Sequence, residues 1–169
     1  MRPSFDQIWQ WLESVSDPEI PAISVVDLGI VRDLHWDEAA QSCRLVVSVT
    51  PTYSGCPATS VIASDIETEL RKRGISEVRV ETKLSPPWTT DWISAAGLES
   101  LKRYGIAPPL RRSDCMLPIR FYPREAIRVV CPRCASDDTV KVSEFGSTPC
   151  KAQYTCKDCL EPFDYFKSF

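Results

Sequence analysis

The sequence predicts a chain of the α/β (α+β) class, in which a small mixed three-stranded sheet packed with helices is followed by a C-terminal ribbon. Helical and strand periodicities alternate along the first part of the 169 residues in the order helix, strand, strand, helix, strand, helix, which is typical of helices on one small sheet. The last part instead carries two Cys-x-x-Cys motifs, the pattern of a zinc ribbon. We therefore expect a first domain at residues 1–107, a linker at 108–128 and a zinc ribbon at 129–169.

The first helix is predicted from its capping residues and its apolar stripe. Ser4 is a candidate N-cap, and Gln7, three residues later, completes a capping box. Apolar residues then recur on one helical face, at Ile8, Trp11, Leu12 and Val15. We expect the helix to end near Ser16, because Asp17 precedes a proline and such residues avoid helical backbone angles.

Two strands and a second helix follow. Residues 30–36 alternate in part between apolar and polar side chains, and residues 43–50 are β-branched and apolar, so both segments predict strands. The polar segment 37–42 is expected to form the hairpin loop between them. A helix should begin at Pro57, since proline is tolerated in a first turn, and end at Gly74, which fits the position after a helix C-terminus.

One more strand and one more helix are expected before the ribbon. Apolar and charged residues alternate over 77–83, which indicates a strand with one face in water. Thr89 or Thr90 is expected to cap a third helix that ends near Gly105. Prolines interrupt residues 106–130 without a clear periodicity, which favours a linker with at most one strand.

Four cysteines, Cys131, Cys134, Cys156 and Cys159, form two knuckles separated by 21 residues. Each Cys-x-x-Cys turn presents two thiolates, and two such turns make a tetrahedral sulfur cage that suits zinc. A redox dithiol and a rubredoxin-type iron are alternatives that the spacing leaves open. Cys150, six residues before Cys156, could replace one of the four ligands. Because the ribbon is small, we expect the metal to supply much of its stability.

A second candidate site is centred on Cys56, which directly precedes the second predicted helix. As the N-cap of that helix, Cys56 would meet free backbone N–H groups and the helix dipole, which favour a thiolate over a thiol. Gly55 leaves room beside it, and the hydroxyls of residues 52–54 can bond a bound sulfur or anion. The alternative is an inert, buried cysteine.

Few other side chains are candidates for catalysis or for binding a ligand. Asp17, Glu19 and Asp27 are a possible acidic cluster, for which the alternative roles are turn formation and capping. His35 is the one histidine and is expected in a strand as a structural side chain, so a Ser-His-Asp triad or a His-rich catalytic metal centre is hard to build. No Gly-rich phosphate loop is present. We therefore expect a protein that is not an enzyme.

Composition excludes some partners. The net charge of −3 offers no electrostatic basis for nucleic-acid binding. No apolar stretch reaches the roughly 18–20 residues of a membrane span, and the N-terminus lacks the apolar core of a signal peptide. We expect a cytoplasmic protein with no membrane partner, in which most of the eight cysteines stay reduced.

Two groups of motifs resemble known families. Five segments resemble the domain shared by SufT-like iron–sulfur assembly factors: Asp17-Pro18-Glu19-Ile20-Pro21, Val26-Asp27-Leu28-Gly29-Ile30-Val31, Thr50-Pro51, Gly55-Cys56-Pro57 and Ser85-Pro86-Pro87-Trp88-Thr89. The C-terminal stretches at 143–148, 150–152 and 161–167 resemble the PaaD (PaaJ) family of phenylacetate-degradation proteins. Together the resemblances cover nearly the whole chain.

The resemblance implies an accessory protein of aerobic phenylacetate degradation. That family accompanies the multicomponent phenylacetyl-CoA epoxidase, a monooxygenase with a diiron oxygenase and an iron–sulfur reductase, and these components are the implied partners. The implied role is to mature or insert an iron–sulfur or iron centre. Cys56 carries over as the residue that contacts the cluster or partner, with Asp27 and Glu19 as polar neighbours. The four knuckle cysteines carry over as the zinc site.

Two further functions stay open at this point. One is a docking subunit of the oxygenase, contacted through the aromatic tail Phe163, Tyr165, Phe166 and Phe169, unless these rings pack inside the protein. The other is a thiol enzyme that uses Cys56 or a knuckle for redox chemistry. A single Cys56 cannot ligate a cluster alone, so a partner or a homodimer with two Cys56 side chains near its axis is needed. Cys43 is expected in the core, and Cys115 could be an additional ligand.

Overall fold

The computed structural model describes residues 2–38, 43–110 and 128–169. The chain forms two compact units, one that ends at Gly97 and one that begins at Leu98. The first domain was expected to extend to residue 107, but the short strand β4 (Ile106–Ala107) pairs in parallel with β7 (Pro162–Phe166) of the ribbon. Most of the expected linker, residues 111–127, and Cys115 lie outside the described residues. None of the helices in the described ranges has the length and apolarity that a membrane crossing requires.

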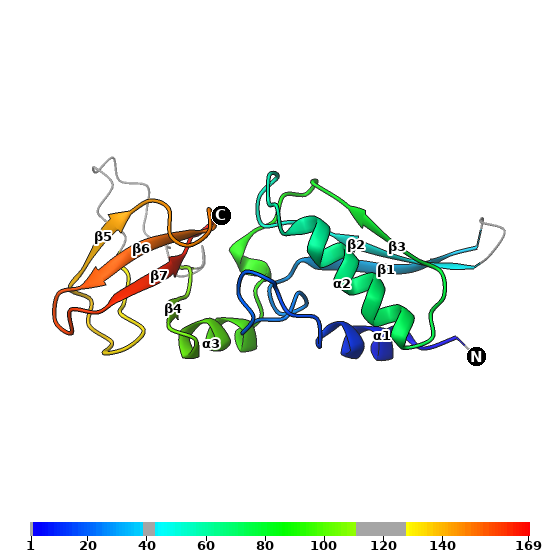
Figure 1. The fold of residues 1–169 in the computed structure, drawn as a ribbon, viewed down its shortest axis with the longest axis horizontal. Coiled ribbons are helices and arrows are strands. Elements are labelled where there is room, and N and C mark those ends of the chain that lie inside the picture. Colours follow the sequence, from blue (N-terminus) through cyan, green and yellow to red (C-terminus); the bar gives the residue numbers. More distant parts are fainter. Residues whose placement is uncertain (1, 39–42, 111–127) are drawn as a thin grey trace, which may run out of the picture. The chain divides into compact units, whose positions relative to one another are not determined.

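The sheet of the first unit has three strands in the order β1-β2-β3. β1 (Val31–Asp37) runs antiparallel to β2 (Arg44–Val49), and β3 (Val78–Thr82) is parallel to β2. The parallel pair is joined by α2 (Thr59–Lys72), which lies along the sheet (Figure 1). The predicted mixed three-stranded sheet packed with helices is confirmed.

The register of this sheet separates an apolar face from a polar one. Leu45 and Val47 of β2 stand beside Val78 and Val80 of β3. These side chains and Leu34 of β1 are buried, except for Val80, which is half-buried. The buried side chains of α2 are Ile62, Ile66 and Leu70. On the other face, Asp33, His35 and Arg79 are largely exposed and Glu81 is half-buried. The side chains of Val46 and Ser48 in the central strand β2 are buried on this face as well. The first face therefore carries the apolar side chains of all three strands, whereas only the central strand is buried on both faces.

Helix α1 (Phe5–Leu12) has the predicted start but an earlier end. The Ser4 hydroxyl accepts a bond from the Gln7 N–H and the Gln7 side chain accepts one from the Ser4 N–H, so the capping box is confirmed. The helix ends at Leu12 instead of near Ser16, because the backbone beyond it bonds to a distant segment. Val25 donates its N–H to the Val15 carbonyl at 2.9 Å. Periodicity along the chain carries no information about such a pairing.

The prediction of a single third helix is wrong, because the structure has two separate elements in this region. A short 3₁₀ turn, η1 (Thr90–Trp92), is separated from α3 (Ala95–Arg103) by the extended Ile93 and by Ser94. Thr89 caps the first turn by accepting the Asp91 N–H, as expected for a cap in this region. The break follows from a tertiary bond, because the Ser94 N–H donates to the Asp27 carbonyl at 2.8 Å instead of continuing the helix.

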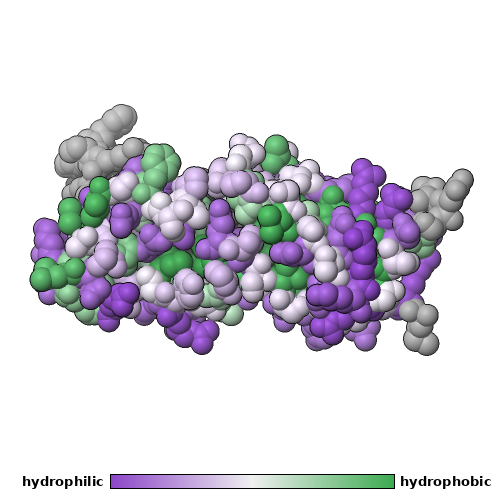
Figure 2. Space-filling model, in the orientation of Figure 1, coloured by the Kyte–Doolittle hydropathy of each residue, from purple (hydrophilic) through white to green (hydrophobic). Residues whose placement is uncertain are grey.

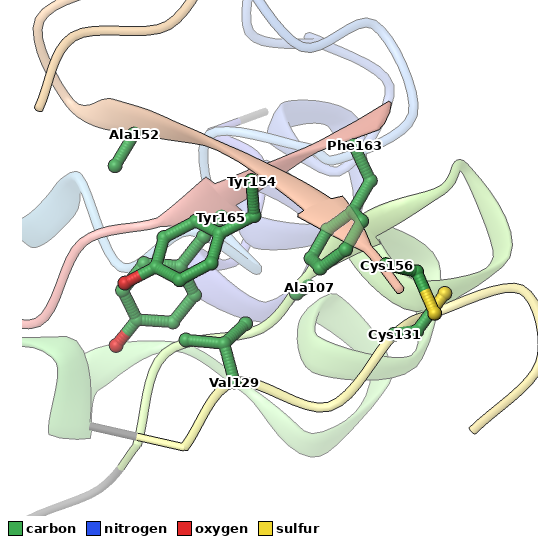
Figure 3. Close-up of a cluster of buried hydrophobic side chains, with 8 residues drawn as sticks. All are labelled: Ala107, Val129, Cys131, Ala152, Tyr154, Cys156, Phe163 and Tyr165. Carbon is green, nitrogen blue, oxygen red and sulfur yellow. The ribbon is translucent and has the colours of Figure 1, made fainter. Parts of the chain in front are cut away.

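The second unit is a four-stranded sheet in the order β4-β7-β6-β5. β5 (Thr139–Ser143) and β6 (Lys151–Cys156) are antiparallel, as are β6 and β7. Its core is a cluster of eight buried residues, drawn in Figure 3: Ala107, Val129, Cys131, Ala152, Tyr154, Cys156, Phe163 and Tyr165. Tyr154 stacks on Phe163 and meets Tyr165 edge to face, with ring centroids 5.9 and 5.6 Å apart. Two of the four rings of the aromatic tail thus form the interior of the ribbon, and Phe166 is also fully buried.

Candidate metal centre and the Cys56 loop

The structure brings the four predicted knuckle cysteines together. The sulfur atoms of Cys131, Cys134, Cys156 and Cys159 all lie within 4.8 Å of one another. Two contacts cross between the knuckles, Cys131 to Cys159 at 3.8 Å and Cys134 to Cys156 at 3.5 Å. A zinc ion with four Zn–S bonds of ~2.3 Å holds its sulfurs about 3.8 Å apart. The spacing and the all-thiol donor set therefore fit a tetrahedral zinc ion.

The two knuckles share one backbone geometry. In the first, the Cys131 N–H donates to the Ser136 carbonyl at 2.8 Å, and in the second the Cys156 N–H donates to the Glu161 carbonyl at 3.1 Å. The residue after each second cysteine has a positive φ, 62° at Ala135 and 63° at Leu160. This repeated turn aims both sulfurs of each knuckle at the same point.

Backbone amides favour thiolates in this centre. N–H groups of Cys159 and Asp158 hydrogen-bond to the Cys156 sulfur and lower the pKa of Cys156 to about 7. The Ser136 N–H also favours the thiolate of Cys134, but burial and the neighbouring thiols outweigh it and raise the pKa of Cys134 to about 12. Four crowded thiols thus lose their protons unequally, and a bound cation is what allows all four to be thiolates at once.

The remaining described cysteines lie apart from this group. Cys150 is buried, and its sulfur lies 3.0 Å from the Thr148 hydroxyl oxygen, so the paired knuckles assemble without it. Cys43 is half-buried directly before β2, whereas the sequence suggested a strand residue in the core.

Cys56 is not the N-cap of α2, in contrast to the prediction. The helix begins at Thr59 with Ala58 as its N-cap, and Pro57 lies before the cap. Cys56 instead belongs to the preceding turn, where its N–H donates to the Tyr53 carbonyl at 3.2 Å. Its own carbonyl accepts the Thr59 hydroxyl at 2.9 Å and so ties the turn to the helix.

The expected thiolate at Cys56 is also wrong. Partial burial raises the pKa of the Cys56 thiol, and the carboxylates of Glu19 and Asp17 raise it further. Hydrogen bonds from the Ala58 N–H and the Tyr53 side chain lower the pKa of Cys56, but by less than burial and the carboxylates raise it. Burial and the nearby carboxylates therefore favour the thiol form of Cys56, and the acidic turn at 17–19 lies within electrostatic reach of its sulfur.

The two acids of that turn have different environments. Asp17 is buried, and its Oδ1 accepts the N–H groups of Glu19 and Ile20, both at 2.8 Å. This is the turn-forming role that the sequence left open for Asp17. Glu19 is half-buried, and of the two carboxylates it has the stronger effect on the pKa of the Cys56 thiol.

Asp27 is held by two serines. Ser94 donates to its Oδ1 at 2.5 Å and Ser24 donates to its Oδ2 at 3.0 Å. Ser24 and Ser94 are not among the site residues predicted from the sequence. The spacing Ser24-x-x-Asp27 is that of a capping box and could have indicated the first of them, whereas Ser94 is 67 residues from Asp27 and carries no local signal.

Comparison with known proteins agrees with both parts of the chain. Residues 6–82 match the family model described as "Iron-sulfur cluster assembly protein", and residues 118–167 match the "PaaD zinc beta ribbon domain". A protein of Escherichia coli (strain K12), named as a subunit of a "Putative 1,2-phenylacetyl-CoA epoxidase", is 45% identical over 165 residues, which are 98% of this chain and 93% of that protein. The chain belongs to the PaaD family.

The first unit has further relatives outside the PaaD family. The "Fe-S protein maturation auxiliary factor SufT" of Staphylococcus aureus (strain USA300) is 35% identical over 81 residues, 47% of this chain and 88% of that protein. A crystal structure titled as a domain of unknown function, DUF59, from Bacillus anthracis matches with a TM-score of 0.51 and 31% identity. It covers 57% of this chain and 89% of the matched chain. The PaaD family thus joins a SufT-like domain to a zinc ribbon.

Proposed function

We propose that this PaaD-family protein is a non-catalytic accessory factor that matures or inserts the iron–sulfur or iron centre of a phenylacetyl-CoA epoxidase system. The observation that carries the proposal is Cys56, which lies in a turn beside the acidic segment 17–19 within the part that matches iron–sulfur assembly proteins. The name of the Escherichia coli relative indicates the client system.

In this proposal Cys56 and Glu19 offer the cargo one sulfur and one carboxylate oxygen. Two donors cannot complete the coordination of an iron ion or a cluster, so a client protein or a second copy of the chain supplies the rest. Because the pKa of Cys56 is raised, cargo binding displaces a proton from its thiol. Weak, incomplete ligation suits a factor that passes the cargo on.

Asp27 has an indirect part in the proposal. Its carboxylate oxygens are engaged by Ser24 and Ser94, so it orders the segment around residue 27 instead of touching the cargo. The four knuckle cysteines would hold zinc, which supplies folding free energy to the ribbon and no step of cargo handling.

The geometry disfavours the thiol-enzyme alternative. A redox cysteine needs a thiolate at working pH, and burial together with nearby carboxylates keeps Cys56 protonated. The knuckle thiols are arranged for a metal, which sequesters them from exchange chemistry.

The test is metal and acid-labile sulfide content after anaerobic purification and cluster reconstitution. Wild type, Cys56→Ala and Cys43→Ala are compared, since Cys43 is a half-buried cysteine of the same unit with no role in the proposal. We expect about one zinc per chain in all three, and iron only in wild type and Cys43→Ala. Iron retained in Cys56→Ala would refute the proposal.

A non-catalytic docking component of the epoxidase is the second candidate, favoured by the word "subunit" in the name of the relative. It predicts that the chain binds the epoxidase and that Cys56→Ala alters neither binding nor the iron content of the complex. If the epoxidase lost its iron in a strain whose only copy of this protein carries Cys56→Ala, a purely docking role would be excluded.

A further inference from the structure

Leu160 is the most anomalous residue of the ribbon. It follows the last knuckle cysteine, its φ is 63°, and 75% of its side chain is exposed. A non-glycine residue in this left-handed region costs about 1–2 kcal/mol of strain, and an exposed leucine recovers none of it through burial. Among the described residues it is the most exposed of the large hydrophobic side chains.

The other knuckle shows what the fold requires at this position. Ala135 is its counterpart, with φ 62° and the same position after a second cysteine. The turn therefore demands the backbone angle but not a large apolar side chain. Asparagine or glycine would meet that demand with less strain. The leucine at position 160 is thus unexplained by the folding of the ribbon.

Charge around the knuckles indicates what Leu160 would meet. Residues 128–138 and 156–161 carry three cations and four carboxylates, Arg128, Arg133 and Lys157 against Asp137, Asp138, Asp158 and Glu161. Asp137 is paired with Arg128 and Asp138 with Lys157, so the net charge of −1 comes from Asp158 and Glu161 against Arg133. A zinc ion held by four thiolates would add about −2. Glu161, the immediate neighbour of Leu160, is exposed. The apolar side chain therefore projects from a negatively charged end of the ribbon.

A row of side chains on the sheet lies close to Leu160 in the chain. Val140, Thr155 and Pro162 are successive partners in the registers of β5, β6 and β7, so they lie in one row on the face opposite the core. Val140 is 46% exposed, and Pro162 is two residues from Leu160. Figure 2 shows apolar side chains at the end of the ribbon where β6 turns into β7.

We propose that Leu160 is the apolar anchor of a protein–protein contact, and that its partner is an epoxidase subunit with an apolar socket bordered by lysine or arginine. The choice of an epoxidase subunit rests on the proposed function; the apolar-and-basic chemistry of the socket rests on the ribbon alone. An apolar side chain contributes most to binding when it fills a desolvated pocket at the centre of an interface and a polar rim excludes water around it, and the opposite charges favour fast association.

The test titrates purified epoxidase subunits of the same organism against the full chain, as wild type, Leu160→Gly and Ala135→Gly. Both substitutions relieve a positive φ, so we expect zinc content and melting temperature to be unchanged or higher in both. We expect Leu160→Gly alone to weaken binding by about tenfold or more. We also expect Glu161→Gln to reduce the salt dependence of the association rate.

Several outcomes would overturn the inference. One is equal affinity of wild type and Leu160→Gly, and another is no binding of wild type to any subunit. A third is a lower molar mass of Leu160→Gly in light scattering, which would assign the surface to a second copy of the chain. The Cys56-dependent iron content is measured in a separate experiment. The proposed carrier role can therefore fail while Leu160→Gly still weakens binding, and the binding effect can fail while the carrier role holds.

Discussion

The sulfur atoms of Cys134 and Cys156 lie 3.5 Å apart although the hairpin of β5 and most of β6 separates them in the chain. Cys134 belongs to the first knuckle and Cys156 to the second. Their contact therefore holds the hairpin of β5 and β6 against the segment that precedes β5. The Cys156 side chain is also part of the buried cluster of the ribbon. The metal centre and the ribbon core are therefore one cooperative structure.

Removal of the metal should unfold the ribbon selectively. We expect a strong zinc chelator to abolish the near-ultraviolet circular dichroism of Tyr154 and Tyr165, since uncompensated thiolates repel and the small core cannot hold alone. All five tryptophans lie in the first unit, at positions 9, 11, 36, 88 and 92. Tryptophan fluorescence therefore serves as the internal control and should stay unchanged; a concerted change in both signals would contradict the prediction.

The reactivity of Cys56 should depend on Glu19. Because the pKa of Cys56 is raised, we expect alkylation at pH 7.5 to be slower than for an unperturbed cysteine and to accelerate as pH rises. Glu19→Gln removes one raising charge, so it lowers that pKa, increases the thiolate fraction and should speed alkylation about two- to tenfold. Peptide mapping by mass spectrometry measures the rate at Cys56 alone. Glu77→Gln, an exposed acid of the same unit, is the control and should have no effect.

Gly29 should not tolerate a side chain. Its φ is +72°, and a Cβ there would lie 2.5 Å from the carbonyl oxygen of Trp92. We expect Gly29→Ala to destabilise the first unit by about 3 kcal/mol or more, from backbone strain together with the displacement of η1. Gly74→Ala is the matched control, with φ +93° and no atom within 4 Å of the added Cβ. Urea unfolding followed by tryptophan fluorescence should show a loss of only about 1 kcal/mol for the control.

The capping box of α1 should contribute measurably to the first unit. Ser4→Ala removes the acceptor of the Gln7 N–H and should lower the free energy of unfolding by about 1 kcal/mol. Ser4→Asp retains an acceptor at the N-cap and should restore most of the loss. Equal urea midpoints for wild type and Ser4→Ala would show that the helix is held by the packing of Ile8 and Leu12 alone.

Much of this architecture follows from local patterns. The capping box at Ser4, the turns at Gly74 and Gly105 and the alternating strands are each determined by neighbours in the chain, which is why periodicity predicts them. Two of the errors occur where another segment of the chain supplies a hydrogen bond. Val25 ends the first helix early, and Asp27 divides the expected third helix at Ser94. The N-cap of α2 was misplaced by two residues because a turn through Pro57 precedes it.

The grouping of the four knuckle cysteines and the order of most elements could be predicted from the chain alone, because cysteine spacing and amphipathic periods are properties of neighbouring residues. The state of Cys56, in contrast, depends on the folded arrangement. The acids at 17–19 are far from Cys56 in the chain, and folding places their charges within reach of its thiol. Folding likewise buried Phe163, Tyr165 and Phe166 of the tail and left Leu160 exposed. Both outcomes depend on which distant surfaces meet, and electrostatic and packing energies arise only when they do.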